Sequence, residues 1–153
     1  MTDNWSRHRS KALLLVLILT AFFLRMYRLA GPPLSWDEGW SIGLSSLPWA
    51  EINRITALDV HPPLYYYLFK LWLGLGKSEL LLRFLSVIFG LLMIPLAFAA
   101  ARAWTRATSD RVDGELVGLL AAFVTMLSPF LLYYSQVARM FSLCAALGLV
   151  AGY

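Results

Sequence analysis

The chain has 153 residues, of which 59% are hydrophobic and 14% are charged. A soluble domain carries about 25% charged residues, so this composition excludes an ordinary soluble domain and indicates an integral membrane protein built from helices. The net charge of +4 does not indicate nucleic-acid binding, because the basic residues are scattered rather than clustered on one polar face.

The first predicted element is an uncleaved transmembrane helix over residues 12–29. It follows a polar and basic N-terminal segment, an order that secretory signal peptides also show. Cleavage after Ala30, however, would put Arg28 where a small residue is needed. We therefore expect a span that stays in the protein, with Arg25 and Arg28 extending to the far membrane interface.

A long segment, residues 31–78, follows this span and is expected to form an outer loop. It contains two predicted short helices that lie in the membrane interface. One begins near Ser46 and Pro48, and its apolar residues share one face. The other is the aromatic run 64–72, which Lys70 interrupts and which is short for a span.

Three further segments without charge, 84–101, 116–134 and 141–153, predict a transmembrane helix bundle. The last segment has 13 residues, fewer than the ~20 that a span needs, so we expect the N-terminal part of a longer polytopic domain. Basic residues before the first span and after the second predict a cytoplasmic N-terminus. The loop residues concerned are Arg102, Arg106 and Arg111.

Two adjacent carboxylates, Asp37 and Glu38, lie between Trp36 and Trp40. One interpretation is a polar turn that tryptophans anchor in the membrane interface, where this side chain is enriched. The other is a reaction site, in which one carboxylate accepts a proton from a hydroxyl nucleophile and the second orients an acceptor or a metal.

The predicted topology brings polar residues from distant segments to one face of the membrane. A charged group inside an apolar segment is costly. Arg83 and Arg139 are therefore expected either to reach the lipid headgroups or to have a phosphate or carboxylate partner, and a guanidinium suits phosphate because it offers paired donors. A single histidine, His61, does not predict a zinc site. The converging residues are Asp37, Glu38, Asp59, His61, Arg83, Gln136 and Arg139. This arrangement suits chemistry on an anionic substrate that the membrane holds.

A succession of motifs resembles the polytopic GT-C-type glycosyltransferases, in order and spacing, over nearly the whole chain. The similarity is to bacterial members related to protein O-mannosyltransferases and to the lipid A aminoarabinose transferase. The motifs are Arg25-x-Tyr27-Arg28-Leu29, Trp36-Asp37-Glu38-x-Trp40, Asp59-x-His61-Pro62-Pro63-x-Tyr65-Tyr66, Arg83-x-x-Ser86, and Ser128-Pro129 leading to Tyr133-Tyr134-Ser135-Gln136-x-Ala138-Arg139-Met140.

The resemblance implies the N-terminal part of a GT-C fold in the bacterial inner membrane. Such an enzyme transfers a sugar from a polyprenyl-phosphate carrier to an acceptor hydroxyl on the outer face, with inversion. Asp37 would be the catalytic base, and Glu38 would help to bind acceptor or donor. The substrate-binding positions implied are His61, Arg83, Tyr134, Gln136 and Arg139, with the two arginines holding the carrier phosphate.

The sequence departs from its relatives at Val137, where they commonly have glutamate, and at Phe141, where they have tyrosine. This leaves open whether the protein uses a divalent metal. The alternative hypothesis is a non-catalytic membrane scaffold or a transport component. A transporter is expected to have polar or Gly/Pro-broken segments at mid-membrane, and the polar residues here are predicted at the rim. The sequence therefore favours the enzyme, although the fragment alone is expected to be inactive.

Overall fold

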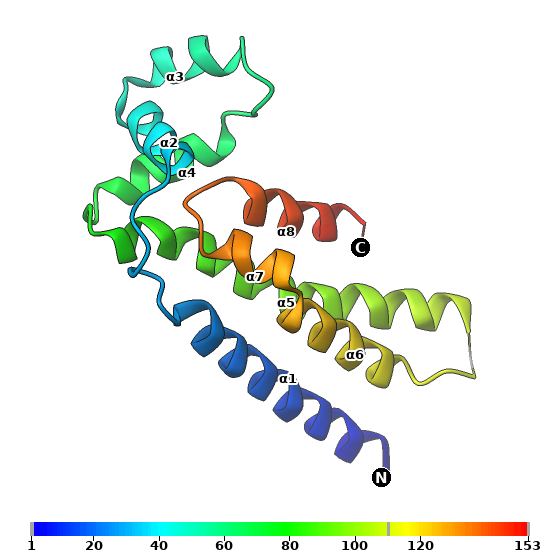
Figure 1. The fold of residues 1–153 in the computed structure, drawn as a ribbon. Helices are drawn as coiled ribbons and strands as arrows, with labels where there is room; N and C mark the ends of the chain where they lie inside the picture. The colour runs from blue at the N-terminus through cyan, green and yellow to red at the C-terminus, as the bar shows by residue number, and fades with distance from the viewer. Residues whose placement is uncertain (1, 110, 153) are drawn as a thin grey trace.

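The computed structural model describes residues 2–109 and 111–152, and every element of regular secondary structure within these ranges is a helix. Three long helices, α1, α5 and α6, pack side by side, and α2, α3 and α4 gather beyond one end of them (Figure 1). The start of α1, the end of α5 and the start of α6 lie at the other end (Figure 1). The helices are α1 (Thr2–Met26), α2 (Trp36–Ser46), α3 (Trp49–Thr56), α4 (Leu64–Leu73), α5 (Glu79–Thr108), α6 (Gly114–Leu127), α7 (Pro129–Ser135) and α8 (Phe141–Ala151).

The first predicted span lies in α1, but this helix ends at Met26 because Arg28 has a positive φ of 55°, outside the helical range. The expectation that Arg25 extends to the interface is wrong. Its side chain is fully buried, next to Gly90 of α5, where an added Cβ would lie 3.1 Å from Nε of Arg25. The gap that this glycine leaves accommodates the guanidinium between helices. Arg28, in contrast, is exposed.

The acidic pair does not form a turn, because Asp37 and Glu38 lie in the first turn of α2. A capping box starts this helix: the Ser35 hydroxyl accepts from the Glu38 N–H, and the Glu38 carboxylate accepts from the Ser35 N–H. Two carboxylates in the first turn also complement the positive end of the helix dipole.

Residues 31–78 contain both short helices that the sequence predicts, and the first of them begins later than expected. The helix expected near Ser46 is α3, which begins at Trp49 after Pro48. Ser46 does not cap it but ends α2, where its hydroxyl donates to the Ile42 carbonyl. The aromatic helix expected over 64–72 is α4, in which Tyr65, Tyr66 and Phe69 are buried.

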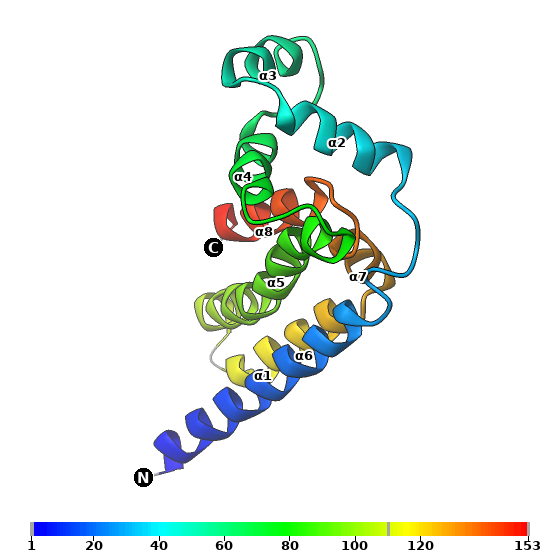
Figure 2. The same ribbon diagram turned by 90° about the vertical axis from the view of Figure 1, so that its left-hand side faces the viewer.

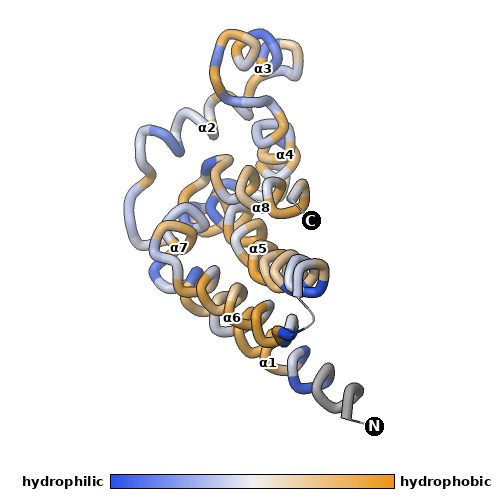
Figure 3. Tube along the Cα trace, turned by 90° about the vertical axis from the view of Figure 1, so that its right-hand side faces the viewer, coloured by the Kyte–Doolittle hydropathy of each residue, from blue (hydrophilic) through white to orange (hydrophobic). Residues whose placement is uncertain are grey.

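The segment expected over 84–101 becomes the longer helix α5, which the Ser78 hydroxyl caps by accepting from the Leu81 N–H. Within the described residues α5 is the one unbroken helix that is long and apolar enough to cross a membrane. The tube in Figure 3 shows the apolar residues along α1, α5 and α6 and hydrophilic residues near the ends. Composition and fold together support an all-α protein with a membrane helix.

The third predicted span, 116–134, is divided into α6 and α7, which meet at a bend of 60°. Pro129 starts α7, and a proline cannot donate the backbone hydrogen bond that would continue α6. Ser128 caps the new helix by accepting from the Leu131 N–H. The bend turns the chain toward α8, which packs along α5 (Figure 2).

Close contact between α5 and α6 depends on Gly118, where an added Cβ would lie 2.8 Å from both a ring carbon and the carbonyl oxygen of Phe98. We expect Gly118→Ala to lower the free energy of unfolding by about 1–3 kcal/mol, because backbone as well as side chain must move. Thermal unfolding in detergent micelles measures the effect. Gly148→Ala is the matched control, since its Cβ would meet nothing within 4 Å and alanine favours a helix. Equal effects at the two positions would contradict this packing.

Candidate functional site

A buried ion pair joins α2 to α5. The carboxylate of Glu38 accepts from Nε of Arg83 at 2.7 Å and from Nη2 at 2.9 Å. The same carboxylate accepts from the backbone N–H of Ser35 at 2.9 Å and from that of Ala138, in the α7–α8 connection, at 3.1 Å. Both charged side chains are almost inaccessible to solvent. Glu38 therefore fixes three parts of the chain to one another.

The remaining N–H groups of Arg83 also have partners within the protein. Nη1 donates to the carbonyl oxygens of Leu29 at 2.8 Å and Pro32 at 2.9 Å, and Nη2 donates to that of Pro33 at 3.2 Å. A guanidinium has five N–H donors, and all of them are occupied here. The structure thus uses Arg83 to hold the α1–α2 connection against α5.

The electrostatics of Glu38 follow from these contacts. Burial raises the pKa of its carboxyl, but the hydrogen bonds from Arg83, Ser35 and Ala138 and the charge of Arg83 outweigh burial and hold this pKa below its ordinary value. Ionised Glu38 therefore stabilises the fold at and above the ordinary pKa. This contribution is lost as the pH falls through the lowered pKa of the folded state.

We expect Glu38→Gln to destabilise the protein by about 3–5 kcal/mol at neutral pH, because it leaves the buried Arg83 charge without its partner. The difference in stability between wild type and variant should shrink as the pH is lowered from about 7 to about 3, since wild-type Glu38 then also becomes neutral. Thermal unfolding across this pH range tests both points. Glu51→Gln, which breaks the exposed pair with Arg54, should change little. A pH-independent difference would contradict the assigned role.

A second group of charged side chains surrounds an open pocket of about 330 Å³ between α2, the α3–α4 connection and the α7–α8 connection. Asp37 is exposed on α2, one residue before Glu38. The lining residues are Trp36, Asp37, Trp40, Asp59, His61 and Arg139. Three of the sequence-predicted site residues, Asp37, His61 and Arg139, are thus brought together here.

Arg139 differs from Arg83 in how its guanidinium is used. It is buried, with 6% of its surface accessible, and Nη1 makes only long contacts, 3.4 Å to the Asp37 carbonyl oxygen and 3.5 Å to the Ser41 hydroxyl. Nε has no hydrogen-bond partner among the described residues. The guanidinium carbon lies 5.8 Å from the centre of the Phe141 ring. Arg139 therefore retains donors that a ligand in the pocket can use.

His61 is oriented by Asp59. Its Nδ1 lies 3.0 Å from Oδ2 of Asp59, whose other oxygen accepts from the Val60 N–H at 2.7 Å. The hydrogen bond from His61 is the main reason that the pKa of Asp59 is lowered, and the charge of Arg139 contributes. This bond leaves Nε2 of the imidazole for other partners. Asp59 is one of the residues that the sequence predicts to converge on this face, although the resemblance assigned it no role in substrate binding.

Gln136 and Tyr134, the other predicted substrate-binding residues, have structural contacts outside this pocket. The Gln136 amide donates to the backbone carbonyls of Arg25 at 2.9 Å and Tyr27 at 3.1 Å, and so satisfies the C-terminal end of α1. It lines a separate cavity of about 240 Å³ together with Glu38 and Arg83. The ring of Tyr134 packs against those of Phe130 and Phe141.

Tyr66 is a polar residue near the charged pocket that the sequence did not single out. Its hydroxyl is buried and has no hydrogen-bond partner among the described residues. Burial raises its pKa, which the nearby charge of Arg139 lowers in part. The run Tyr65-Tyr66-Tyr67 does not show which ring faces inward. Only the packing of α4 against α2 and α5 decides this.

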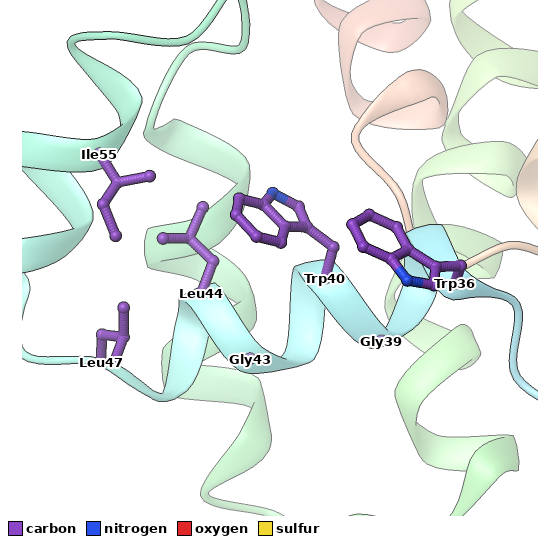
Figure 4. Close-up of a pocket in the computed structure, with 7 residues that line it drawn as sticks. All are labelled: Trp36, Gly39, Trp40, Gly43, Leu44, Leu47 and Ile55. Atoms are coloured by element: carbon purple, nitrogen blue, oxygen red, sulfur yellow. The ribbon is translucent and has the colours of Figure 1, made fainter.

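An apolar groove of about 500 Å³ runs along α2 beside the charged pocket. Trp36 and Trp40 border both hollows, and their rings are stacked at 5.9 Å. Figure 4 shows the two indoles above the side-chain-free positions Gly39 and Gly43, with Ile55 of α3 closing the far end. The charged pocket thus continues into a surface that suits hydrocarbon.

No group of three or more His, Cys, Asp or Glu side chains in residues 2–109 and 111–152 lies close enough to hold a metal ion, so we assign no metal ligands. Val137 lines the cavity beside Glu38 and Arg83. No protein-family model matches the chain, and no curated protein or solved structure is similar enough to be matched. The function proposed below therefore rests on the geometry of the site residues.

Proposed function

We propose that the chain forms part of a polytopic membrane glycosyltransferase of the GT-C type. It would transfer a sugar from a polyprenyl-phosphate carrier to an acceptor hydroxyl on the outer face of the bacterial inner membrane. The observation that carries this proposal is the pocket in which the carboxylate-bearing residue Asp37 and the guanidinium of Arg139 meet. A proton acceptor beside a phosphate-binding cation is what such a transfer needs.

Of the two arginines expected at the site, Arg139 is the one that binds the carrier phosphate in this proposal. Its Nε lacks a partner and its Nη1 contacts are long, whereas the hydrogen-bond donors of Arg83 are filled. A buried guanidinium also binds an anion more strongly than an exposed one, because less water screens it. Glu38 and Arg83 then position the pocket without contacting the substrate.

The transfer itself is a direct displacement. Asp37 accepts the proton of the acceptor hydroxyl while the hydroxyl oxygen forms its bond to the anomeric carbon. The bond from that carbon to the phosphate oxygen breaks, and the phosphate leaves with the bonding electrons. Arg139 stabilises the charge that develops on it. His61, held by Asp59, is placed to hydrogen-bond the sugar or the acceptor.

The apolar groove supports a lipid-linked donor. It shares Trp36 and Trp40 with the charged pocket, so a phosphate at Arg139 would have its isoprenoid chain beside an apolar surface. Seven residues line the groove, and they contribute almost no polar area. Burial of hydrocarbon there stabilises binding in proportion to the apolar area removed from water.

The membrane arrangement belongs to the same proposal. Besides α5, we place α1 and the bent pair α6–α7 across the bilayer, with the N-terminus cytoplasmic and α2–α4 on the outer side. Large apolar side chains are exposed along α1 and α6, and lipid would cover them. Examples, each more than half exposed, are Leu15, Val16, Phe23, Leu120 and Val124.

One observation favours the second candidate, a transport component. The α6–α7 pair is bent by 60° at Pro129, and broken helices build the substrate sites of many transporters. The buried Arg25, whose Nε and Nη2 lack partners among the described residues, lies close to this region against Ser135 and Gly90. The charged pocket, however, is formed by α2 and the connections outside the bundle, which fits the enzyme better.

Asp37→Asn is expected to lower the rate of sugar transfer by at least about 100-fold, because an amide cannot accept the proton. The assay uses the complete protein in vesicles, with a polyprenyl-phosphate sugar and an acceptor extract. Asp113→Asn is the control, since Asp113 caps α6 at the opposite end and asparagine caps equally well. Transfer at the wild-type rate by the Asp37 variant would remove Asp37 as the base.

Arg139→Ala is expected to weaken binding of the polyprenyl phosphate by about 10-fold or more, because a charge-assisted contact with the phosphate is lost. Arg139→Lys should restore part of the affinity, since it keeps the charge but not the paired donors. Binding is measured with the complete protein by calorimetry, and Arg111→Ala provides a control outside the pocket. Equal affinity in wild type and the alanine variant would favour the non-catalytic alternative.

A further inference from the structure

A basic pocket lies between α1, α5 and α6. The end of α5 and the start of α6, which contribute to it, lie at the end of the bundle opposite α2–α4 (Figure 1). Its volume is about 400 Å³, and three cations and a single carboxylate line it over an apolar floor of Leu14 and Phe98. The charged residues are Lys11, Arg102, Arg106 and Glu115. In the sequence, the two arginines served only to predict the orientation of the chain in the membrane. The proposed sugar transfer does not involve them.

Glu115 organises this pocket. A single carboxylate oxygen accepts from Nη1 of Arg102 at 3.1 Å and from Nη2 of Arg106 at 3.0 Å. The guanidinium carbon of Arg102 also lies 5.3 Å from the centre of the Phe98 ring. One negative charge thus holds two positive charges side by side. The arginine pair keeps an excess of positive charge and N–H donors that Glu115 does not occupy.

Lys11 contributes a further positive charge from α1. No carboxylate in the described part of the chain forms an ion pair with it. The pocket therefore combines excess positive charge with paired donors that match phosphate oxygens. An anion is the ligand that this chemistry favours.

The surroundings indicate an anion that carries hydrocarbon. Large apolar side chains close in sequence to the pocket residues are exposed. They are Leu13 of α1 (50% exposed) and Leu116 and Leu120 of α6 (55% each). Trp104, on the same end of α5, is 73% exposed, as expected for an indole at the membrane interface. A phospholipid whose phosphate is bound in the pocket would place its acyl chains along these apolar side chains.

We infer that this pocket binds the headgroup of an anionic phospholipid of the cytoplasmic leaflet, with its phosphate on Lys11, Arg102 and Arg106. Basic pockets between membrane helices on the cytoplasmic side bind such headgroups. The inference rests on the membrane placement in the proposed function, but not on sugar transfer. It gives the three helices a lipid that joins them at this end.

The test measures the affinity of the complete detergent-solubilised protein for phosphatidylglycerol and for phosphatidylcholine by native mass spectrometry. Wild type should bind phosphatidylglycerol about tenfold more tightly. Lys11→Gln, which breaks no ion pair, should reduce this preference about fivefold, as expected for one basic residue at an anionic surface. Arg111→Gln, a loop cation outside the pocket, should leave it unchanged.

A second variant changes the affinity in the opposite direction. Glu115→Gln removes the carboxylate that competes for the arginines, so phosphatidylglycerol should bind more tightly although the ion pairs are lost. Equal affinity of wild type for the two lipids, or equal loss in Lys11→Gln and Arg111→Gln, would overturn the inference. Displacement of the lipid by millimolar inorganic phosphate would identify a free-phosphate site instead.

Failure of this inference is distinguishable from failure of the proposed membrane placement. Alkaline carbonate extraction of vesicles shows whether the protein is integral. Extraction from the vesicles would refute the placement itself. Retention in the vesicles without a preference for phosphatidylglycerol would refute the lipid site alone.

Discussion

The carboxylate of Glu38 is the constraint on which the rest of the arrangement depends. It accepts hydrogen bonds from α5, from the start of α2 and from the α7–α8 connection. The two residues proposed for chemistry are sequence neighbours of this contact: Asp37 precedes Glu38, and Arg139 follows Ala138. Fixing the backbone at one point thereby sets the positions of a proton acceptor and a cation from segments far apart in the chain.

The adjacent carboxylates Asp37 and Glu38 have different roles, one in the proposed chemistry and the other in the fold, and the sequence alone could not tell which residue has which role. Glu38 is buried and saturated with donors, while Asp37 is exposed at the charged pocket. The two arginines divide in the same way, since Arg83 is saturated and Arg139 is not. In each pair the fully bonded member organises the fold, and the proposed function assigns the other member to a ligand.

The sequence predicted α4, α5 and α8 because apolar or aromatic runs largely define them. The start of α2 is also marked in the sequence, because Ser35 and Glu38 have the spacing of a capping box. The same carboxylate also fits the pattern of a reaction site, so the sequence alone does not separate the two roles. The buried position of Arg25 was not predictable, because it depends on which helices pack together, as the contact of Arg25 with Gly90 shows. The break at Pro129 is a local consequence of the proline, whereas the angle of 60° between α6 and α7 depends on packing.

The contact between Glu38 and Ala138 also has a consequence for biosynthesis. The partners are 100 residues apart, whereas Glu38 and Arg83 are separated by 45. At about 5–20 residues per second, Glu38 is made roughly 5–20 s before the last donor to its carboxylate. In the proposed membrane arrangement, residues 31–78 would therefore be translocated before the last hydrogen-bond donor to Glu38 is made. The final packing of this segment would be a late event of assembly, completed only after the chain beyond α7 is synthesised.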